Sequence, residues 1–286
     1  GAEVVMPSDP DADRIGLVIR DNNGEYVLIN GNQIVMIFLN YLMTRNTELG
    51  TLTGNEYIVK TIVTTETIRT IAEAQHIKMY DCFTGFKWIA NVMRENEGKA
   101  RYLGGGEESY GFLAEDFVRD KDSVSAISLM AEIAAWAKDK GLNMTDMLID
   151  IYMKYGFSRE KGISLVRKGK SGAEEIIALM KQFRENPPKE IAGSPVVTVK
   201  DFQSLVETNV ATGETKKLDM PTTSNVLQYY TADRTKVSVR PSGTEPKIKF
   251  YIEVHDTLAS ADEYKATEAR ADEKINRIAK EFGITK

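Results

Sequence analysis

Residues 57–103 decide the fold, and they read YIVKTIVTTETIRTIAEAQHIKMYDCFTGFKWIANVMRENEGKARYL. Apolar and β-branched runs alternate in this stretch with segments that have helical apolar spacing. Strands that alternate with helices are typical of a doubly wound α/β sheet, in which ligands bind beyond the carboxyl ends of the strands. The predicted strands are residues 57–63, 77–80 and 101–103, and the predicted helices are residues 66–74 and 86–94.

The predicted order of helices and strands changes along the chain. Before this stretch we predict strands at residues 2–6, 15–20 and 26–29 and a helix at 32–41. After it we predict helices at residues 123–139, 144–155, 173–184 and 261–282 and strands at 196–199, 226–230, 237–240 and 248–254. The late strands follow one another without intervening helices, so the C-terminal part is predicted to be a small α+β domain.

The amino-acid composition is typical of a soluble globular protein. The chain has 286 residues, of which 42% are hydrophobic and 28% are charged, and this length suggests more than one domain. A net charge of −5 argues against nucleic-acid binding. A protein this acidic that handles an anionic substrate must gather its positive charge in local sites.

The cysteine content and the hydropathy pattern indicate the type of protein and its location. Cys82 is the only cysteine, which excludes a disulfide framework and favours a cytoplasmic location. The most apolar window, residues 34–43, is too short to span a membrane, and no signal peptide opens the chain. The chain begins at a strand without a methionine, so we expect it to be part of a longer protein.

Three aspartates stand at alternate positions in the loop Ser8–Arg14, SDPDADR, after the opening strand. Carboxylates this close raise one another's pKa unless a cation neutralises them. Mg²⁺ prefers a few carboxylates together with water or phosphate oxygens. The loop therefore predicts a divalent-metal site formed by Asp9, Asp11 and Asp13, with Arg14 as an anion-binding neighbour.

Other proteins use similar acidic loops differently. A calcium-binding EF-hand would need Gly at the position of Arg14 and Glu at the position of Arg20, which excludes it. A phosphatase-type D-x-D nucleophile remains an alternative, since Asp9 and Asp11 follow an apolar strand. A solvated acidic turn without a metal is the third interpretation.

A glycine-rich stretch, GGGEESYG at residues 104–111, follows the third predicted strand. Glycines let the backbone approach a ligand, and carboxylates with a hydroxyl suit sugar hydroxyls. A flexible turn without a ligand would use the same residues. The segments Thr84–Lys87 and Arg119–Lys121 could bring cations to this edge, although lone lysines are usually solvated.

A third loop, RPSGTEPK at residues 240–247, combines a guanidinium, two hydroxyls and a glycine that frees backbone N–H groups. This combination predicts a phosphate clamp, and a hairpin turn with surface charge is the alternative. It is the local positive site that an acidic protein needs for an anionic substrate. The candidate phosphate-binding residues are Arg240, Ser242, Gly243, Thr244 and Lys249.

Together and in this order, the three loops resemble those of the α-D-phosphohexomutases, the family of phosphoglucomutases and phosphomannomutases. DPDADR is similar to the family's metal loop, GGEESYG to its sugar loop and RPSGTEPK to its phosphate loop. The tyrosine of EESYG, with TGFKW and VRDKD, is most similar to the bacterial phosphoglucomutase branch that also resembles phosphopentomutases. The likeness covers essentially the whole chain.

This resemblance implies three parts of a four-domain fold. We expect residues 1–24 to end an α/β domain that carries the metal loop. Residues 25–157 would form a complete, doubly wound, mixed-sheet α/β domain that binds sugar, and residues 158–286 an α+β domain with an antiparallel sheet that binds phosphate. The family's nucleophilic serine lies in a T-A-S-H-N-P-like loop. Neither His76 nor His255 stands in that context, so we expect missing N-terminal domains to supply the serine.

The resemblance also implies roles for single residues. Asp9, Asp11 and Asp13 would bind Mg²⁺, and the missing phosphoserine would complete this metal site. Arg14 would contact the transferring phosphate. Lys121 is the expected general acid/base, since a lysine beside other cations can have a lowered pKa, and Lys87 is the second choice.

The other residues would bind the substrate. Glu107 and Ser109 would hold ring hydroxyls, and Thr84 and Arg119 would line the same cleft. The predicted phosphate clamp would hold the phosphate that is not reacting. Its residues are Arg240, Ser242, Gly243, Thr244 and Lys249.

The implied activity is that of an isomerase, an intramolecular phosphotransferase that interconverts hexose 1-phosphate and hexose 6-phosphate through a phosphoserine and a bisphosphate. Its partners would be glucose or mannose phosphates, with no nucleic acid and no membrane, and this chain alone would be inactive. Phosphopentomutase activity, a phosphosugar- and metal-binding module without turnover, and a metal-dependent phosphatase using Asp9 or Asp11 remain alternatives.

Overall fold

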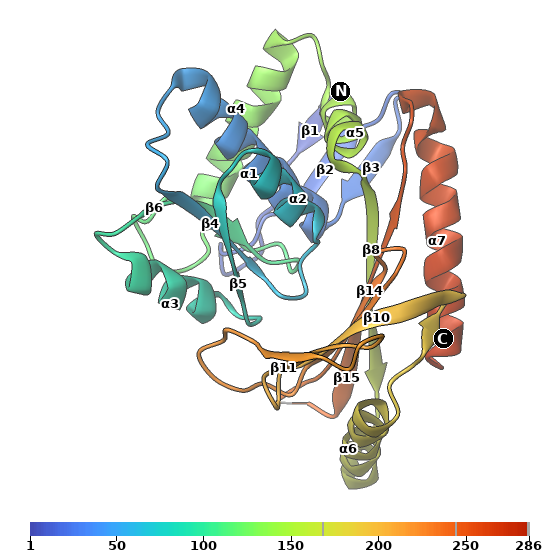
Figure 1. The fold of residues 1–286 in the computed structure, drawn as a ribbon. Helices are drawn as coiled ribbons and strands as arrows, with labels where there is room; N and C mark the ends of the chain where they lie inside the picture. The colour runs from blue at the N-terminus through green and yellow to red at the C-terminus, as the bar shows by residue number, and fades with distance from the viewer. Residues whose placement is uncertain (168, 244, 285–286) are drawn as a thin grey trace. The chain divides into compact units, whose positions relative to one another are not determined.

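The computed structural model describes residues 1–167, 169–243 and 245–284, and Figure 1 labels its helices and strands. The chain divides into two compact units, and each is taken by itself. The first comprises Gly1–Gly156 and Leu258–Ala261, and the second comprises Phe157–Thr257 and Asp262–Lys286. The division at residues 24 and 157 that the sequence suggests stays a prediction.

The first unit contains the mixed sheet that the sequence predicts. Its strands stand in the order β5-β4-β6-β7, with β4 parallel to β5 and β6, and with β7 antiparallel to β6. Every residue of the central strand β4 is buried, as expected of a strand covered on both faces. The bounds are β4 Glu56–Thr61, α2 Thr67–Ala74, β5 Lys78–Cys82, α3 Phe86–Asn96, β6 Arg101–Gly106 and β7 Phe112–Ala114.

Strand β6 is longer than predicted. The sequence suggests a strand at residues 101–103 and then a loop, but β6 continues through Gly106. A Cβ atom at Gly105 would lie 2.7 Å from the carbonyl oxygen of Val59, and one at Gly106 would lie 2.7 Å from Val35. The glycines therefore serve close packing, because their neighbours leave no room for a side chain.

Helix α1 spans Gly31–Leu49 and is longer than the predicted segment 32–41. Asn30 and Gln33 form a capping box, in which each side chain accepts the other residue's backbone N–H. The helix ends at Gly50, whose φ of 65° is in the left-handed region. Its apolar first turns allowed the prediction, whereas its polar last turns carry no apolar periodicity.

Three further strands and two helices complete the first unit. A small antiparallel sheet, β1-β2-β3, buries Leu17, Ile19 and Ile29 on one face. Helices α4 and α5 begin and end where the sequence predicts. The bounds are β1 Val4–Val5, β2 Leu17–Arg20, β3 Tyr26–Ile29, α4 Ser123–Asp139 and α5 Met144–Tyr155.

Over the described residues, the second unit holds one antiparallel sheet of eight strands, as the sequence predicts for an α+β part. The strand order is β12-β11-β10-β13-β14-β15-β8, and β9 pairs with β10. Strands β8, β9, β11 and β12 were not predicted, because β9 has only two residues and the polar residues of the others lack a clear alternation. The bounds are β8 Phe157–Val166, β9 Glu190–Ile191, β10 Ser194–Asp201, β11 Val206–Asn209, β12 Thr215–Lys217, β13 Leu227–Thr231, β14 Lys236–Pro241 and β15 Lys247–Asp256.

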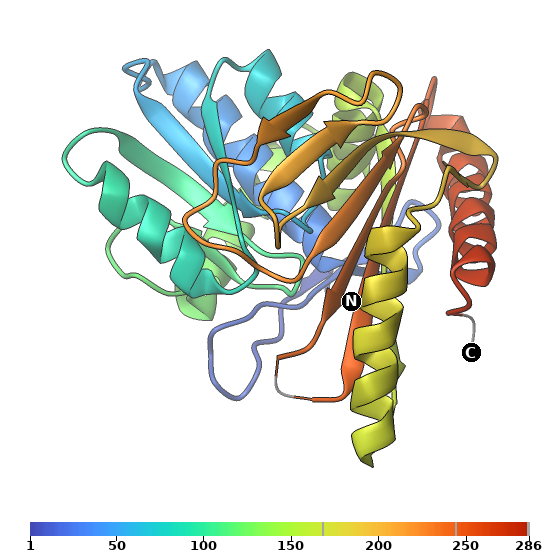
Figure 2. The same cartoon turned by 60° about the horizontal axis from the view of Figure 1, so that its bottom comes forward.

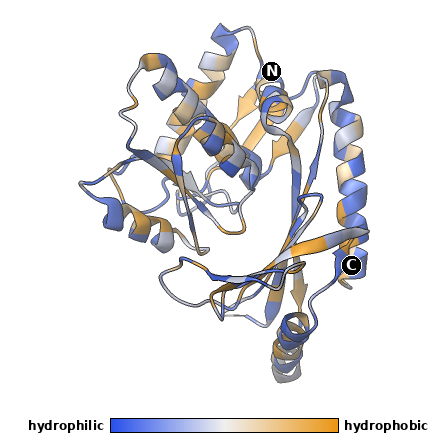
Figure 3. Ribbon diagram, viewed as in Figure 1, coloured by the Kyte–Doolittle hydropathy of each residue, from blue (hydrophilic) through white to orange (hydrophobic). Residues whose placement is uncertain are grey.

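Helices α6 (Gly169–Glu185) and α7 (Tyr264–Glu281) pack on this sheet, α6 against β14 and β15 and α7 against β15 and β8 (Figures 1 and 2). The ring of Phe250 lies 5.9 Å from that of Phe183 and 6.0 Å from that of Phe282. Hydrophilic colours cover much of α7 in Figure 3, because only one side of this helix is buried. No helix in the described part of the chain has the length and apolar character needed to cross a membrane.

Asp122 caps helix α4, and we predict that Asp122→Ala costs about 1 kcal/mol of stability. Its carboxylate accepts the N–H groups of Ser125 at 2.9 Å and Val124 at 3.3 Å. Although burial alone would raise the pKa of Asp122, hydrogen bonds from the Ser125 side chain and from these two N–H groups lower it below its ordinary value. The stabilisation should therefore be complete above the unfolded-state pKa, near about 3.9, and disappear as pH falls through the folded-state pKa.

Urea unfolding followed by tryptophan fluorescence measures this effect, because both tryptophans, Trp88 and Trp136, lie in the first unit. Asp122→Asn is the matched control, since asparagine also caps helices well. A loss for Asp122→Ala that is the same at pH 7 and at pH 2 would contradict the role of the ionised cap.

Candidate functional site

The aspartate loop is a tight turn held by its own backbone. One carboxylate oxygen of Asp9 accepts the N–H groups of Asp13 and Arg14, both at 3.1 Å. The Arg14 N–H is the largest of several interactions that hold the pKa of Asp9 below its ordinary value. The mutual raising of carboxylate pKa values that the sequence suggested is therefore wrong for Asp9. Asp11 is exposed.

Two side-chain cations offset part of the negative charge of this loop. The Lys121 amine lies 2.7 Å from one Asp13 oxygen, and the Arg14 guanidinium lies 3.2 Å from the other. Carboxylates are the right ligand type for Mg²⁺. However, among the described residues no three His, Cys, Asp or Glu side chains gather into a group that could hold a metal. The three-aspartate metal site thus stays a prediction.

Backbone hydrogen bonds join the aspartate loop to two segments that are distant in sequence. The Ile15 N–H donates to the carbonyl oxygen of Tyr110 at 3.2 Å. The Ser123 N–H donates to the carbonyl oxygen of Ala12 at 3.1 Å, and the hydroxyls of Ser8 and Ser123 lie 2.6 Å apart. The fold therefore brings together the SDPDADR loop, the end of GGGEESYG and the segment that carries Lys121.

Glu107 lies deeper than a sugar-binding carboxylate would suggest. Only 3% of its surface is exposed, and one of its oxygens accepts the Gly85 N–H at 2.6 Å. This bond ties the predicted sugar loop to the Thr84-Gly85 turn at the start of α3. Thr84 and Ser109 are half-buried beside it, and the sugar-binding roles of all these residues stay predictions.

Residues that the sequence did not single out support the same loop. The hydroxyls of Thr61 and Thr64 donate to one oxygen of Glu108 at 3.2 and 3.5 Å. A Cβ atom at Gly31 would lie 2.0 Å from the Glu108 carbonyl oxygen. Position at the carboxyl end of a central strand was the one signal that could have found Thr61.

A buried ion network lies at the same ends of strands β4 and β5. The amine of Lys60, which is completely buried, lies 3.0 Å from Glu66 and 2.8 Å from Asp81. Arg69 pairs with both carboxylates, which raise its pKa although burial alone would lower it. The sequence did not single out this network, because the register of the parallel strands β4 and β5 is what sets Lys60 beside Asp81.

The surroundings of Lys121 differ from those expected. Burial alone would lower its pKa, but hydrogen bonds and charges from Asp13 and Asp120 raise the pKa of Lys121 above its ordinary value. The argument that neighbouring cations lower this pKa is therefore wrong, because the neighbours that face the amine are carboxylates. Arg119 pairs with Glu97 at 3.1 Å, and the Lys87 amine lies 5.2 Å from the centre of the Trp88 ring.

The predicted phosphate loop lies in the second unit, between strands β14 and β15. Arg240 and Lys249 are directly opposite each other in the strand register, and among the described residues neither forms an ion pair with a carboxylate. Arg240 donates a hydrogen bond to the Tyr251 hydroxyl at 3.3 Å. Ser242 donates its N–H to the Lys247 carbonyl oxygen at 2.8 Å.

The space beside Gly243 is open, since a Cβ atom there would meet nothing within 4 Å. Thr244 lies outside the described residues. The sequence did not indicate Tyr251 as a site residue, because aromatic residues are common in strands.

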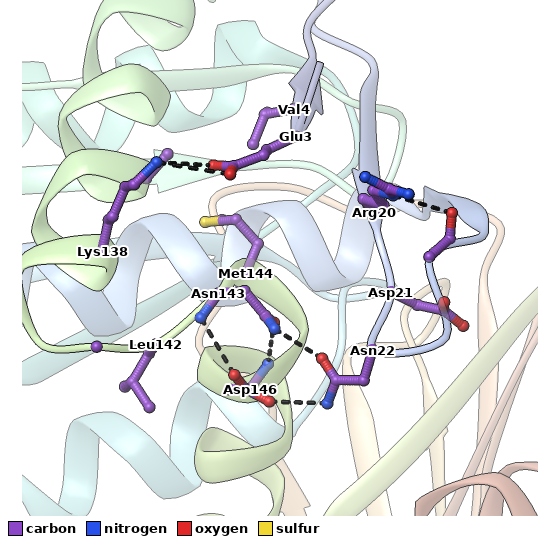
Figure 4. A pocket seen from close by; sticks show the side chains of 13 residues that line it. Glu3, Val4, Arg20, Asp21, Asn22, Lys138, Leu142, Asn143, Met144 and Asp146 are labelled. Atoms are coloured by element: carbon purple, nitrogen blue, oxygen red, sulfur yellow. Dashed lines mark hydrogen bonds and ion pairs between the residues drawn. The ribbon is translucent and has the colours of Figure 1, made fainter. Parts of the chain in front are cut away.

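A cavity of about 720 Å³ in the first unit contains none of the predicted site residues. Several of its polar side chains pair with one another, as Figure 4 shows. Lys138 lies 3.3 Å from Glu3, and the amide of Asn22 donates to Asp146 at 2.8 Å. Because the cavity holds none of the candidate residues, we do not assign the site to it.

Family models match most of the chain. A model of the phosphoglucomutase/phosphomannomutase alpha/beta/alpha domain III matches residues 30–155. A model of the C-terminal domain of phosphoglucomutase/phosphomannomutase matches residues 180–271. The two matched segments lie in the same order along the chain as the loops GGGEESYG and RPSGTEPK that they contain.

Individual relatives agree with these models. A phosphoglucomutase from Staphylococcus epidermidis is 36% identical over 251 residues, which are 88% of this chain and 45% of the relative. The structure of pp63/parafusin, a phosphoglucomutase from Paramecium in its open form, matches with a TM-score of 0.59 and 15% identity over 97% of this chain and 46% of its own.

A third relative is N-acetylphosphoglucosamine mutase from Aspergillus fumigatus, in complex with GlcNAc-6P and magnesium. It matches with a TM-score of 0.50 and 13% identity over 97% of this chain and 51% of its own. The chain thus spans about half the length of the relatives that it matches. The matching domain models, the curated relatives and the shared fold lead to one conclusion: the chain belongs to the α-D-phosphohexomutase family of phosphoglucomutases and phosphomannomutases.

Proposed function

We propose that this chain is the C-terminal part of a phosphohexomutase that interconverts the 1- and 6-phosphates of glucose or mannose. Preceding domains would supply a phosphoserine, which donates its phosphoryl group to the sugar phosphate and takes a phosphoryl group back from the bisphosphate. The first unit would hold the sugar hydroxyls through Glu107 and Ser109, and the second would hold the non-reacting phosphate through Arg240, Ser242, Gly243, Thr244 and Lys249.

The observation that carries this proposal is the joining of the aspartate loop to the sugar loop and to Lys121. The bond from Ile15 to Tyr110 and the ion pair between Lys121 and Asp13 support the proposal, because they bring Lys121, the aspartate loop and the glycine-rich loop together. Phosphoryl transfer needs chiefly positioning and charge neutralisation. Arg14 and Lys121 supply positive charge at this place.

Magnesium is part of the proposal. Asp9, Asp11 and Asp13 would hold the ion, and the Aspergillus fumigatus relative is in complex with magnesium. When bound, Mg²⁺ would neutralise negative charge on the transferring phosphoryl group. Asp13 would have to exchange its contact with Lys121 for the ion.

The phosphatase alternative has less support. One oxygen of Asp9 accepts two backbone N–H groups, the other lies 3.5 Å from the Arg14 guanidinium, and the pKa of Asp9 is lowered. A carboxylate engaged in this way is a weaker nucleophile, which argues against Asp9 but not against the exposed Asp11. A phosphosugar- and metal-binding module without turnover would use the same residues as the mutase and differs from it only in the missing serine. A phosphopentomutase differs only in its sugar.

We predict that this chain alone does not convert glucose 1-phosphate into glucose 6-phosphate, because it contains no T-A-S-H-N-P-like serine loop. A coupled assay with glucose 6-phosphate dehydrogenase measures this conversion, and the release of inorganic phosphate is recorded in parallel. Robust turnover would contradict the proposed external serine, whereas phosphate release alone would favour the phosphatase.

Asp11→Asn should weaken divalent-metal binding by the chain by at least about tenfold, since even the partners of metal ligands contribute that much. Titration with Mn²⁺, followed by electron paramagnetic resonance, measures the affinity. Asp116→Asn, which changes an exposed aspartate of the same unit outside the loop, is the control. Equal affinities for both variants and the wild type would remove Asp11 from the site.

Arg240→Ala should weaken glucose 6-phosphate binding by about tenfold to a hundredfold, because it removes a charge-assisted hydrogen bond to phosphate. Arg240→Lys should also weaken binding, since lysine lacks the planar fork. Calorimetric titration at fixed salt measures both, and free glucose should bind all variants alike.

Arg277→Ala is the control for Arg240, because it removes the same charge from an exposed position of helix α7 in the same unit. If Arg240→Ala and Arg277→Ala bound glucose 6-phosphate with the affinity of the wild type, RPSGTEPK would be an ordinary turn. The proposed substrate would then lose its main support.

A further inference from the structure

The side chain of Arg240 has an unusual partner. Its guanidinium donates to the hydroxyl of Tyr251 at 3.3 Å, and in the described part of the chain it pairs with no carboxylate. Most of its N–H groups thus stay available, because a guanidinium has five donors. The positive charge also stays uncompensated by any acidic side chain that the structure describes.

The strand register explains why Tyr251 can reach Arg240. Arg240 on β14 faces Lys249 on β15, and Tyr251 faces Ser238. Residues two apart on a strand share a face, so Arg240 and Tyr251 are diagonal neighbours on one face, within reach of a long aromatic side chain. Only 9% of Tyr251 is exposed, so packing holds its hydroxyl in place.

The chemistry of this partner suits a phosphate-binding arginine. A carboxylate in the same place would also orient the guanidinium, but it would neutralise the charge and compete with the phosphate for the same donors. A neutral phenol hydroxyl accepts one N–H and leaves both the charge and the remaining fork for an anion. The hydrogen bond also reduces the side-chain freedom that Arg240 would lose on binding.

We propose that Tyr251 is a positioning residue, which orients the Arg240 guanidinium for the phosphate group of a sugar phosphate. This inference rests on the proposed function, since it gives Arg240 the same ligand. Tyr251 acts through Arg240 and makes no contact of its own with the phosphate. Its contribution must therefore vanish when Arg240 is absent.

Tyr251→Phe, which deletes only the hydroxyl, should weaken the calorimetric affinity for glucose 6-phosphate by about two- to tenfold, the effect of one hydrogen bond. Free glucose should bind as before. Tyr230→Phe is the control, because Tyr230 likewise has a partly buried hydroxyl in this sheet with a side-chain hydrogen bond, which it donates to Gln228 at 3.1 Å. Wild-type affinity for Tyr251→Phe, or an equal loss in Tyr230→Phe, would overturn the proposal.

A double variant separates positioning from a general structural role. Arg240→Ala combined with Tyr251→Phe should bind glucose 6-phosphate no more weakly than Arg240→Ala alone, because the hydroxyl then has nothing to orient. The urea midpoints of the same variants check that each is folded, and those of Tyr251→Phe and Tyr230→Phe compare the loss of one hydroxyl at the two positions. Additive losses of affinity in the double variant would overturn the positioning role.

A measurement without substrate keeps this inference distinct from the proposed function. The nuclear magnetic resonance signals of the Arg240 guanidinium should show slow rotation in the wild type and fast rotation in Tyr251→Phe, with Tyr230→Phe like the wild type. Absence of glucose 6-phosphate binding by the wild type would contradict the proposed function. Equal guanidinium mobility in the wild type and in Tyr251→Phe would contradict the orientation of Arg240.

Discussion

The first unit depends on close backbone packing that only glycine permits. A Cβ atom at Gly105 would lie 2.7 Å from a carbonyl oxygen of β4, and one at Gly31 would lie 2.0 Å from the carbonyl oxygen of Glu108. These contacts set helix α1, strand β4 and strand β6 tightly together. The loop after Gly106 therefore leaves the sheet at one defined place, where Glu107 meets Gly85 and Tyr110 meets Ile15.

Ion pairs occur in both units, but Arg240 and Lys249 form none among the described residues. In the first unit, carboxylates and cations are paired between Asp13 and Lys121 and in the buried network around Lys60. In the second unit, Lys236 pairs with Glu253 at 2.8 Å in the interior. Arg240 and Lys249, in contrast, stand opposite each other on neighbouring strands without an ion pair in the described part of the chain. Paired charges favour a fixed arrangement of loops, whereas unpaired cations favour a bound anion. The unpaired cations support the proposed binding of a phosphate by Arg240 and Lys249.

The neighbours of Lys121 in the sequence differ from its neighbours in the fold. The sequence placed it beside cations and so favoured a lowered pKa, but the folded chain turns it toward Asp13 and Asp120, which raise the pKa. Sequence neighbours such as Arg119 lie elsewhere, since Arg119 pairs with Glu97. A group that exchanges protons in the proposed reaction would need these carboxylates to be engaged by another cation.

The sequence determined the fold class, the family and the three loops, because these rest on local patterns: the alternation of residues 57–103, the spacing of SDPDADR and the composition of RPSGTEPK. Tertiary structure alone decided which distant groups meet. Thr61 with Glu108 and Arg240 with Tyr251 are joined by strand pairing and register, to which no short sequence pattern points. The polar strand β8 was likewise recognisable only once β15 paired with it, since a half-exposed edge strand lacks the apolar alternation that predicts a strand.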